Sequence, residues 1–412
     1  MKIGLFNYSD NLGGAARATY RVHQSLLQEK CNSSLYVNKK TINDKSIKTS
    51  PYIINKNFHT LRTNLISKLI KITNPKIKSY NSLSILPSSW PKFINNSDID
   101  LVHLNWINAE MMSIEDITKI QKPMIWTFHD MWPFLGSLHI SNDEKFTRNT
   151  NFTNKKFLDK ISNLDEWTYF RKKKNWKNPI QIITPSSWLE NCVKQSEIMK
   201  NWPVETIPHP IDIDFWKPNN KEISRTILGI NNQKTILVYG ADGGIKSYNK
   251  GFDLLLKSLQ KIKHHHKDLI LCIFGEEGQI NTQLDFQVIN YGKITDDKKI
   301  REIYNASDLC VVPSRKESFC QVALEAQSCG VPVLAFSIGG LKDILINKIT
   351  GYLIKPYDLD SFASTINKFI ENKKDHSVLK VNARKRVETF FSMSSVAKKY
   401  INIYRKILKF DN

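Results

Sequence analysis

The sequence predicts an α/β protein with two Rossmann-like domains that face each other across a cleft. Three observations support this. Short apolar strands alternate with amphipathic helices along most of the chain, the alternation begins twice, and each start places a glycine-containing turn after its first strand. Such alternation is typical of parallel sheets rather than sandwiches or barrels. The 412 residues also exceed what one hydrophobic core usually supports.

The first domain is expected over residues 1–207. It opens with the apolar strand Lys2–Asn7, the turn SDNLGG and the helix AARATYRVHQSLLQEK. Further strands are predicted in SSLYVN, DLVHLNW, PMIWTFHD and QIIT, and a serine cap precedes the helix SSWLENCVKQSEIM. Prolines then cluster from Pro203 to Pro218, which favours an interdomain linker at 208–220.

The second domain is expected over residues 221–393. Its predicted strands are TILVYGA, DLILCIFGEE, FQVINYGKI, DLCVVPS and VPVLAFS, and its predicted helices are KGFDLLLKSLQKIK, IREIYNAS, FCQVALEAQSCG and DLDSFASTINKFIENKK. Residues 394–412 carry apolar side chains at helical spacing, so a final helix is expected to pack on another part of the protein.

The formal net charge of +21 indicates an acidic partner, a phosphorylated substrate or simply a lysine-rich solvated surface. No nucleic-acid-binding module is recognisable, so nucleic acid is not expected as a partner. The six cysteines form no CxxC pair and several lie in apolar runs, which favours a reduced cytoplasmic compartment and disfavours zinc. No apolar run approaches the roughly 20 residues of a spanning helix, so only peripheral membrane contact is expected.

The basic residues concentrate in one region. Between Lys39 and Ser97, eleven lysines and arginines stand against one acid, Asp44. Within this region FHTLRTNLISKLIKITNPKIK has helical apolar spacing (Phe58, Leu61, Leu65, Ile66, Leu69 and Ile72) beside basic residues, typical of a helix that binds an anionic membrane surface. A core-packing helix with a solvated lysine face fits equally well. A second basic run, Arg171–Lys174, could also bind the membrane or simply cap a helix.

The segment PSRKESFCQVALEAQSCGVPVLAF is the strongest candidate site. Glu317 stands where strand DLCVVP gives way to a helix expected from near Phe319, and Glu325 follows eight residues later. Along a helix the two carboxylates would be about 12 Å apart, enough to touch both ends of a nucleotide sugar, with the helix N-terminal amides facing the diphosphate. The alternative is one capping and one solvated glutamate.

Here the chain resembles a known family. ESFCQVALEAQSCGVPVLAFSIGGLKDI resembles the glutamate–seven–glutamate motif of retaining glycosyltransferase family four, which has the GT-B fold. TGYLIKPYD, NLGGAARA, PSSWLENCVKQS and IPHPIDIDFWKP are similar to other segments of the family, in the same order along nearly the whole chain. WTFHDMWPF is similar to the histidine-bearing strand end of members that build bacterial surface polysaccharides.

The resemblance implies a donor site in the second domain. Glu317 would contact the transferred sugar, Glu325 the ribose hydroxyls, and Lys250 in YNKGFDLL the diphosphate leaving group, for which a compact ammonium charge is suited. Family members carry an arginine several residues before this lysine. Here Lys246 is the only basic residue available, and it either substitutes or points to solvent.

The other predicted donor-binding residues lie in two segments, the one that follows Glu317 and the glycine loop near the N-terminus. Ser318, Phe319 and Cys320 follow Glu317, and Ser318 and Cys320 stand where relatives commonly have glycine. Gly13 and Gly14 match the N-terminal loop that faces the diphosphate, although a plain strand–helix turn also explains them. They do not form GxGxxG, which disfavours NAD binding. Relatives also end with a helix that crosses back to the first domain, as residues 394–412 would.

His129 is the predicted catalytic residue of the first domain. A lone histidine at a strand end is more often structural, but the resemblance implies that His129 faces the sugar, positions a hydroxyl and stabilises the transition state. Asp130 is expected to hold the loop or the imidazole, and His103 to be structural. The acid pairs are expected to cap or form turns rather than bind metal (Asp98/Asp100, Asp212/Asp214, Asp358/Asp360).

The predicted function is therefore a retaining, metal-independent hexosyltransferase. It would move a sugar from a UDP- or GDP-sugar co-substrate to a glycan or lipid-linked acceptor in bacterial surface polysaccharide synthesis, with no other cofactor. Two alternatives remain open: a sugar-nucleotide epimerase on the same fold, and a non-catalytic glycan- or nucleotide-binding protein.

Overall fold

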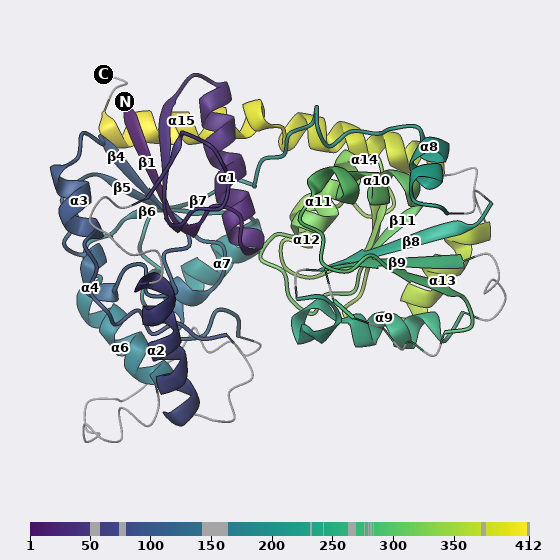
Figure 1. Ribbon diagram of the computed structural model, residues 1–412, viewed down its shortest axis with the longest axis horizontal. Coiled ribbons are helices and arrows are strands. Elements are labelled where there is room, and N and C mark those ends of the chain that lie inside the picture. The colour runs from purple at the N-terminus through teal and green to yellow at the C-terminus, as the bar shows by residue number, and fades with distance from the viewer. Residues whose placement is uncertain are drawn as a thin grey trace. The chain divides into compact units, whose positions relative to one another are not determined.

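The computed structural model describes residues 1–49, 58–73, 80–141, 164–230, 233–241, 243–262, 269–275, 277–278, 280, 282, 284–371 and 376–409. The chain divides into two compact units, the first made of Met1–Pro208 with Val396–Asn412 and the second of His209–Ser395. Figure 1 shows that each unit is a sheet flanked by helices. Some ends of the expected elements lie outside the described residues (263, 268, 276, 372–374 and 410–412).

The first unit contains a seven-stranded parallel sheet in the order β3-β2-β1-β4-β5-β6-β7. Its strands are β1 (Lys2–Ser9), β2 (Asn32–Lys39), β3 (Ile47–Thr49), β4 (Leu101–Leu104), β5 (Met124–Thr127), β6 (Gln181–Thr184) and β7 (Val204–Thr206). Its helices are α1 (Gly13–Gln28), α2 (Phe58–Thr73), α3 (Trp90–Asn96), α4 (Ile114–Ile117), the 3-10 turn η1 (Trp132–Phe134), α6 (Leu164–Asn175), α7 (Ser187–Gln195) and most of α15 (Met393–Leu408).

Successive side chains of these strands face opposite sides of the sheet, and both sides are covered. Leu5 points to the side where α1 and α15 pack, and its neighbour Phe6 points to the side where α3, α4 and α7 pack. Figure 1 shows α15, in yellow, lying along the strands of this sheet. The sequence prediction that the final helix packs by an apolar stripe therefore agrees with the burial of Val396, Tyr400 and Tyr404.

His103 connects this helix to the sheet. The fully buried imidazole lies between the hydroxyl of Tyr404 on α15 and that of Thr127 on β5, each 2.7 Å from one ring nitrogen. The structural role expected for His103 is confirmed, because both of its polar atoms are used inside the core.

The second unit contains a six-stranded parallel sheet in the order β10-β9-β8-β11-β12-β13. Its strands are β8 (Thr235–Gly240), β9 (Leu269–Phe274), β10 (Gln287–Asn290), β11 (Leu309–Val312), β12 (Val333–Phe336) and β13 (Gly351–Ile354). Its helices are α8 (Lys221–Ile227), the 3-10 turns η3 (Gly244–Lys246) and η4 (Tyr248–Lys250), α9 (Phe252–Leu259), α10 (Asp297–Ala306), α11 (Gln321–Ser328), α12 (Leu341–Ile344), α13 (Leu359–Glu371) and α14 (His376–Phe390).

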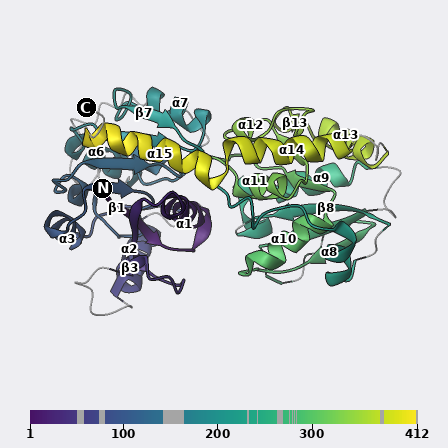
Figure 2. The same ribbon diagram turned by 90° about the horizontal axis from the view of Figure 1, so that it is seen from above.

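Helices again cover both faces of this sheet. α9 and α13 pack on one face, and α10, α11, α12 and α14 on the other. Figure 2 shows α8 beside α10, and the hydroxyl of Ser224 donates to the Glu302 carboxylate between these helices. The segment 209–220, expected as a linker, packs in this unit, where Trp216 is buried and Ile211 pairs with Ser392.

Both sheets have the strand order of doubly wound folds, in which the chain starts in the middle and reverses direction once. The reversal falls between β1 and β4 in the first unit and between β8 and β11 in the second. Ligands of open parallel sheets bind outside the carboxyl ends of the strands at this switch point. The loops that follow these four strands are therefore the expected ligand-binding regions.

The acid pairs named in the sequence serve local structure. Asp358 accepts from the amide of Ser361 at the start of α13, and Asp212 accepts from the amides of Asp214 and Phe215 in a turn. Asp98 instead forms an ion pair with Lys2, whose amide donates to Asp100. Within the described ranges, none of the helices has the length and apolar character needed to cross a bilayer.

Candidate active site

Glu317 lies in the loop between β11 and α11, at the switch point of the second sheet. The helix begins at Gln321, four residues after Glu317 and two later than expected. The separation estimated for two glutamates on one helix therefore does not apply, because the first of them precedes the helix. Glu317 is buried, with 9% of its side chain exposed.

Lys250 meets Glu317 at this point. Its Nζ lies 2.7 Å from Oε1 of Glu317, and the hydroxyl of Ser314 donates to the same oxygen at 2.8 Å. The Lys250 side chain remains 29% exposed. An ammonium has three donors, so Lys250 can hold the carboxylate and still donate to another anion. The structure thus joins two of the residues predicted for the donor site.

Gly251 explains why Lys250 comes so close. It adopts φ +69°, and a Cβ built on it would stand 2.0 Å from the carbonyl oxygen of Pro313 at the end of β11. A side chain at this position would therefore be strained and would collide with backbone. Glycine lets the turn that carries Lys250 pack directly on the strand end that leads to Ser314 and Glu317.

Arg315 fastens the same two segments and was missed in the sequence. Its guanidinium forms a bidentate pair with Asp253 on α9 and donates to the carbonyl of Tyr248, over whose ring it lies at 4.1 Å. Its amide donates to the carbonyl of Asn249. Arg315 thereby holds the turn η4, which ends at Lys250. Its place two residues before Glu317 is the only signal in the sequence that marks it.

The backbone of the Glu317 loop rests on two glycines after β12. The amide of Gly340 donates to the carbonyl of Glu317 at 3.0 Å. A Cβ on Gly339 would stand 2.0 Å from that carbonyl oxygen, and one on Gly340 would stand 2.5 Å from the carbonyl oxygen of Ser318. The loop is therefore fixed by a close backbone approach that only glycine permits.

The three residues after Glu317 differ in what they can offer a ligand. Ser318 is partly exposed. The Phe319 ring is 2% exposed and packs against His209 and Phe391, so any ligand contact at this residue would come from its backbone. Cys320 adopts φ +111°, a conformation costly for a residue with a side chain, which agrees with its position where relatives have glycine.

Glu325 lies within α11 and is 4% exposed. The hydroxyl of the buried Tyr304 donates to its Oε2 at 3.3 Å. Burial and the nearby Glu325 charge raise the pKa of Tyr304 well above its ordinary value, so this phenol stays protonated and can donate. Tyr304 is therefore a partner of the predicted ribose-binding glutamate, and no sequence motif marks it.

The remaining predicted donor residues are Lys246 in the second unit and Gly13 and Gly14 in the first. Lys246 is exposed at the end of η3, in the residues leading to η4. Gly13, with φ +85°, and Gly14 are the first two residues of α1 rather than part of the turn before it, which corrects the expected boundary. Gly14 is exposed, and a Cβ there would meet no atom within 4 Å. The start of α1 thus leaves room for an anion at its amides.

His129 follows β5 at the carboxyl edge of the first sheet, one strand away from the switch point. The ring is 9% exposed, and its Nε2 lies 3.1 Å from Oδ1 of Asn105 and 3.3 Å from the hydroxyl of Thr19. Burial lowers the pKa of His129 to about 4, so the ring is neutral at pH 7. Because an amide oxygen only accepts, Nε2 carries the proton and Nδ1 the lone pair.

Asp130 holds the loop after β5, as expected, but the imidazole that it binds is that of His139 and not that of His129. Oδ1 accepts from the amide of Trp132, and Oδ2 accepts from His139 Nδ1 at 2.7 Å and Trp106 Nε1 at 2.9 Å. Burial alone would raise the pKa of Asp130, but His139 and the other donors lower it below its ordinary value. Asp130 is therefore charged at neutral pH.

Comparison with known proteins agrees with this architecture. The family model "Glycosyl transferases group 1" matches residues 220–386. The lipopolysaccharide 1,2-N-acetylglucosaminetransferase of Salmonella typhimurium is 27% identical over 241 residues, covering 54% of this chain and 61% of that protein. The chain spans between 35% and 61% of the length of the curated relatives it matches.

Solved structures match over nearly the whole chain. Sucrose-phosphate synthase from Thermosynechococcus elongatus superposes with a TM-score of 0.69 at 18% identity, covering 100% of both chains. HepE of Anabaena in complex with UDP-glucose superposes with a TM-score of 0.65 at 15% identity, covering 98% of this chain and 100% of that one. At these identities the likeness establishes the fold. The chain thus has the GT-B fold, and its residues 220–386 match the family model of the group 1 glycosyl transferases.

Proposed function

We propose that this protein is a retaining, metal-independent hexosyltransferase that uses a UDP- or GDP-sugar. Its acceptor would be a glycan or lipid-linked precursor of a bacterial surface polysaccharide, and the reaction would take place in the cytoplasm. The match to the group 1 family model, the Salmonella relative that acts on lipopolysaccharide and the UDP-glucose complex of HepE support this choice.

The contact between Lys250 and Glu317 carries the proposal. It places one cation and one carboxylate side by side at the switch point, each partly or mostly shielded from water. In a shielded site a fixed charge stabilises a departing phosphate more strongly than it would in water. Lys250, whose side chain is partly exposed, would bind the diphosphate while Glu317 binds hydroxyls of the transferred sugar.

The proposed reaction balances without a protein nucleophile. The acceptor oxygen forms a bond to the anomeric carbon on the face from which the nucleoside diphosphate leaves, and the bond from that carbon to the phosphate oxygen breaks. The acceptor proton passes to the departing phosphate. His129, neutral at pH 7, would position a hydroxyl, and Glu325 would bind the ribose. Gly13, Gly14, Lys246 and the Ser318–Cys320 backbone would complete the donor contacts.

Turnover of nucleotide sugars tests the proposal. Purified protein is incubated with UDP-N-acetylglucosamine, UDP-glucose or GDP-mannose, and released nucleoside diphosphate is measured with and without lipid-linked glycan extract. Glu317→Gln and Lys250→Ala should each lower turnover by about 100-fold or more, as loss of one preorganised charge usually does. Lys261→Ala, which breaks an exposed lysine–aspartate pair with Asp360 in the same unit, should leave turnover unchanged.

The products separate this proposal from its alternatives. A transferase releases nucleoside diphosphate faster when acceptor is present, and nuclear magnetic resonance of the product should show the anomeric configuration of the donor. An epimerase would give a new sugar or sugar nucleotide at a rate independent of acceptor. A binding protein would give no release, and equal turnover by wild type and Glu317→Gln would remove Glu317 from the site.

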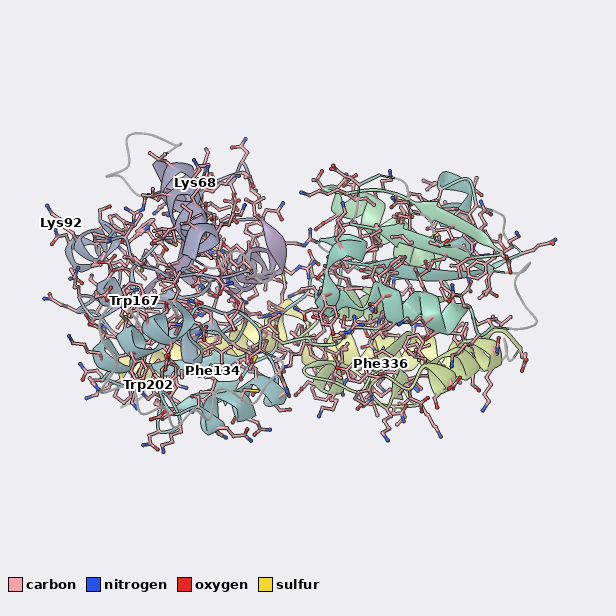
Figure 3. The ribbon with its side chains drawn as sticks, turned by 90° about the horizontal axis from the view of Figure 1, so that it is seen from below. Lys68, Lys92, Phe134, Trp167, Trp202 and Phe336 are labelled. Atoms are coloured by element: carbon pink, nitrogen blue, oxygen red, sulfur yellow. The ribbon has the colours of Figure 1, made fainter. Side chains whose placement is uncertain are left out.

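We also propose that the first unit binds anionic membranes through α2. Ile66 and Ile70 pack this helix against Leu83 and Leu164. Four of the apolar residues that the sequence placed at helical spacing are largely exposed (Leu61 66%, Leu65 58%, Leu69 40% and Ile72 79%). Lys68, labelled in Figure 3, and Lys71 are exposed on the same helix. The Phe58 side chain and residues 74–78 of this stretch lie outside the described part of the chain.

In the second basic run, Arg171–Lys174, only Lys174 is exposed, and the other three side chains bind groups of the protein itself. Arg171 binds the Glu115 carboxylate through two nitrogens, and Lys173 pairs with Glu197. Lys172 is completely buried, with its ammonium donating to the carbonyls of Trp132, Leu135 and Gly136. These side chains stabilise the fold around α6.

Vesicle binding tests the role of α2. The protein should co-sediment with vesicles containing phosphatidylglycerol and not with pure phosphatidylcholine, and Lys68→Glu and Leu65→Ser should each weaken this binding. Lys92→Glu is the matched control, because Lys92 is an exposed lysine on α3 of the same unit (Figure 3). Binding that is independent of anionic lipid, or weakened equally by Lys92→Glu, would contradict the proposal.

A further inference from the structure

Three neighbouring strands of the first sheet end in the same way. Asn7 and Tyr8 lie near the end of β1, Asn105 and Trp106 follow β4, and His129 and Asp130 come shortly after β5. The first member of each pair belongs to a buried polar cluster, in which the Asn105 side chain contacts His129, and the Asn7 side chain accepts from the Thr19 hydroxyl and the Trp106 amide. The second members lie together in a different group.

That second group is a set of aromatic rings around Trp106. The Tyr80 ring is stacked on Trp106 with centroids 6.1 Å apart and planes at 30°, and Tyr8 meets Trp106 edge to face, also at 6.1 Å. The Tyr80 ring also lies 4.9 Å from the His139 ring. Tyr80 is 55% exposed, and Tyr8 and Trp106 are partly exposed. Rings that pack at the surface in this way leave an aromatic face open to a ligand.

The rings are held in place by a charged carboxylate that still has capacity to accept. Asp130 binds Trp106 Nε1 and His139 Nδ1 through Oδ2, and it binds the Trp132 amide through Oδ1. His139 Nε2 in turn lies 2.9 Å from the hydroxyl of Ser82. A carboxylate has about four acceptor positions, so Oδ1 of Asp130, whose side chain is 18% exposed, can accept one more hydrogen bond.

The location is one where ligands bind. Tyr8 lies near the carboxyl end of β1 and Trp106 follows β4, and these are the two strands between which the sheet order reverses. A pyranose ring has a face of C–H bonds and a rim of hydroxyls. An aromatic face packs against the C–H bonds, and a carboxylate accepts hydrogen bonds from the hydroxyls. The rings with Asp130 therefore suit a sugar better than a nucleotide, because the Asp130 charge would repel the phosphates of a nucleotide.

We propose that Tyr80, Trp106 and Tyr8 form a stacking platform for a pyranose unit of the acceptor, with Asp130 accepting from one of its hydroxyls. The choice of an acceptor sugar as ligand rests on the transferase function proposed above. Tyr80 is the exposed ring that stacks on the sugar, and packing against Trp106, which also contacts Tyr8, sets the orientation of the Tyr80 ring.

Saturation-transfer difference spectroscopy on the full chain tests this platform without a known acceptor. The probes are the methyl glycosides of glucose, galactose, mannose and N-acetylglucosamine, and sorbitol serves as a polyol with hydroxyls but no pyranose face. At least one glycoside should receive saturation at its ring C–H protons, and sorbitol should not. Tyr80→Ala should abolish the signal and Tyr80→Phe should keep it. Phe390→Ala, which removes a 49% exposed ring on α14, should have no effect.

Each other outcome overturns the platform. These are absence of binding by the wild type, equal binding by Tyr80→Ala, loss in Tyr80→Phe as well, or binding of sorbitol equal to that of the glycosides. Circular dichroism of the Tyr80 variants checks that the fold is kept. Nucleotide-sugar turnover is measured separately, so Tyr80-dependent glycoside binding without turnover would leave the platform standing and remove the transferase proposal. Turnover that depends on Glu317, without glycoside binding, would support the transferase proposal and overturn the platform.

Discussion

Lys250 Nζ lies 2.7 Å from Glu317 Oε1, although the two residues are 67 positions apart in the chain. Parallel β8 and β11 are neighbours in the sheet, so the segments that follow them emerge at the same edge. Gly251 allows one segment to approach the other, and Arg315 ties them together. The contact is thus a product of sheet topology, one glycine and one arginine.

Arg315 is expected to act as a positioning residue for Lys250. Arg315→Ala removes the bidentate pair with Asp253 and the bond to the Tyr248 carbonyl, so the turn before Lys250 should shift. Small displacements of a catalytic group can cost about 100-fold in rate, and a drop in kcat of at least 10-fold is expected here, with donor KM changed less. Steady-state kinetics with a UDP- or GDP-sugar measures both constants.

Arg386→Ala is the control for this prediction. Arg386 also donates from a partly buried guanidinium to backbone carbonyls of the second unit, those of Asp343 and Ile344. It should lower the thermal midpoint without a selective loss of kcat. If both variants reduce kcat in proportion to their loss of stability, Arg315 has only a structural role.

The alternation of strands and helices was sufficient to predict the fold, because a buried parallel strand reads as a short apolar run whatever its neighbours are. α14 was not predicted. Its buried residues, Leu379, Ala383 and Val387, have helical spacing, but Val378 and Val381 are more than 60% exposed and obscure that pattern. Hydrophobic periodicity fails where exposed positions are also apolar.

The candidate site was predictable only where a residue sits in a motif. Lys250 and Glu317 could be named from the sequence, and the structure places them in contact. Ser314, Tyr304 and Asn105 act through the direction of their side chains after folding. Since direction depends on packing between distant segments, no local pattern marks such residues.

Cys320 is expected to tolerate glycine better than alanine. At φ +111° and ψ +90° a residue with a Cβ is strained by about 1–3 kcal/mol. Cys320→Gly removes the strain and loses the packing of one buried sulfur, whereas Cys320→Ala loses the packing and keeps the strain. The glycine variant should therefore be more stable than the alanine variant by about 1 kcal/mol or more in urea unfolding. An alanine variant of equal or greater stability would show that position 320 is not strained.

Tyr404→Phe should destabilise the first unit without altering its packing volume. The variant removes the hydroxyl that lies 2.7 Å from His103 Nδ1 and leaves that buried nitrogen without this partner. An unsatisfied buried polar atom costs about 1–3 kcal/mol. Tyr20→Phe offers a comparison, because the Tyr20 hydroxyl bonds Asp44 in a partly buried setting where water can replace it. A smaller loss in Tyr404→Phe than in Tyr20→Phe would contradict the prediction.

The stability of the protein should fall as pH decreases below about 6.5, because three buried histidines are neutral in the folded state. Burial lowers the pKa of His23 to about 4, that of His103 to about 3 and that of His129 to about 4. In the unfolded chain each imidazole titrates near 6.5, so the unfolded state takes up protons first. The stability contributed by each neutral ring is complete above pH 6.5 and is lost as pH falls toward its folded pKa.

Each histidine adds about 1.4 kcal/mol per pH unit to this slope over its window. His23 lies outside the candidate site, held between the hydroxyls of Ser33 and Ser46 at 2.8 Å each. His23→Gln should therefore lower stability at pH 7 and reduce the slope between pH 6 and 4.5 by about one histidine's share. Urea unfolding across this range measures the slope, and an unchanged slope would mean that His23 titrates alike in the folded and unfolded chain.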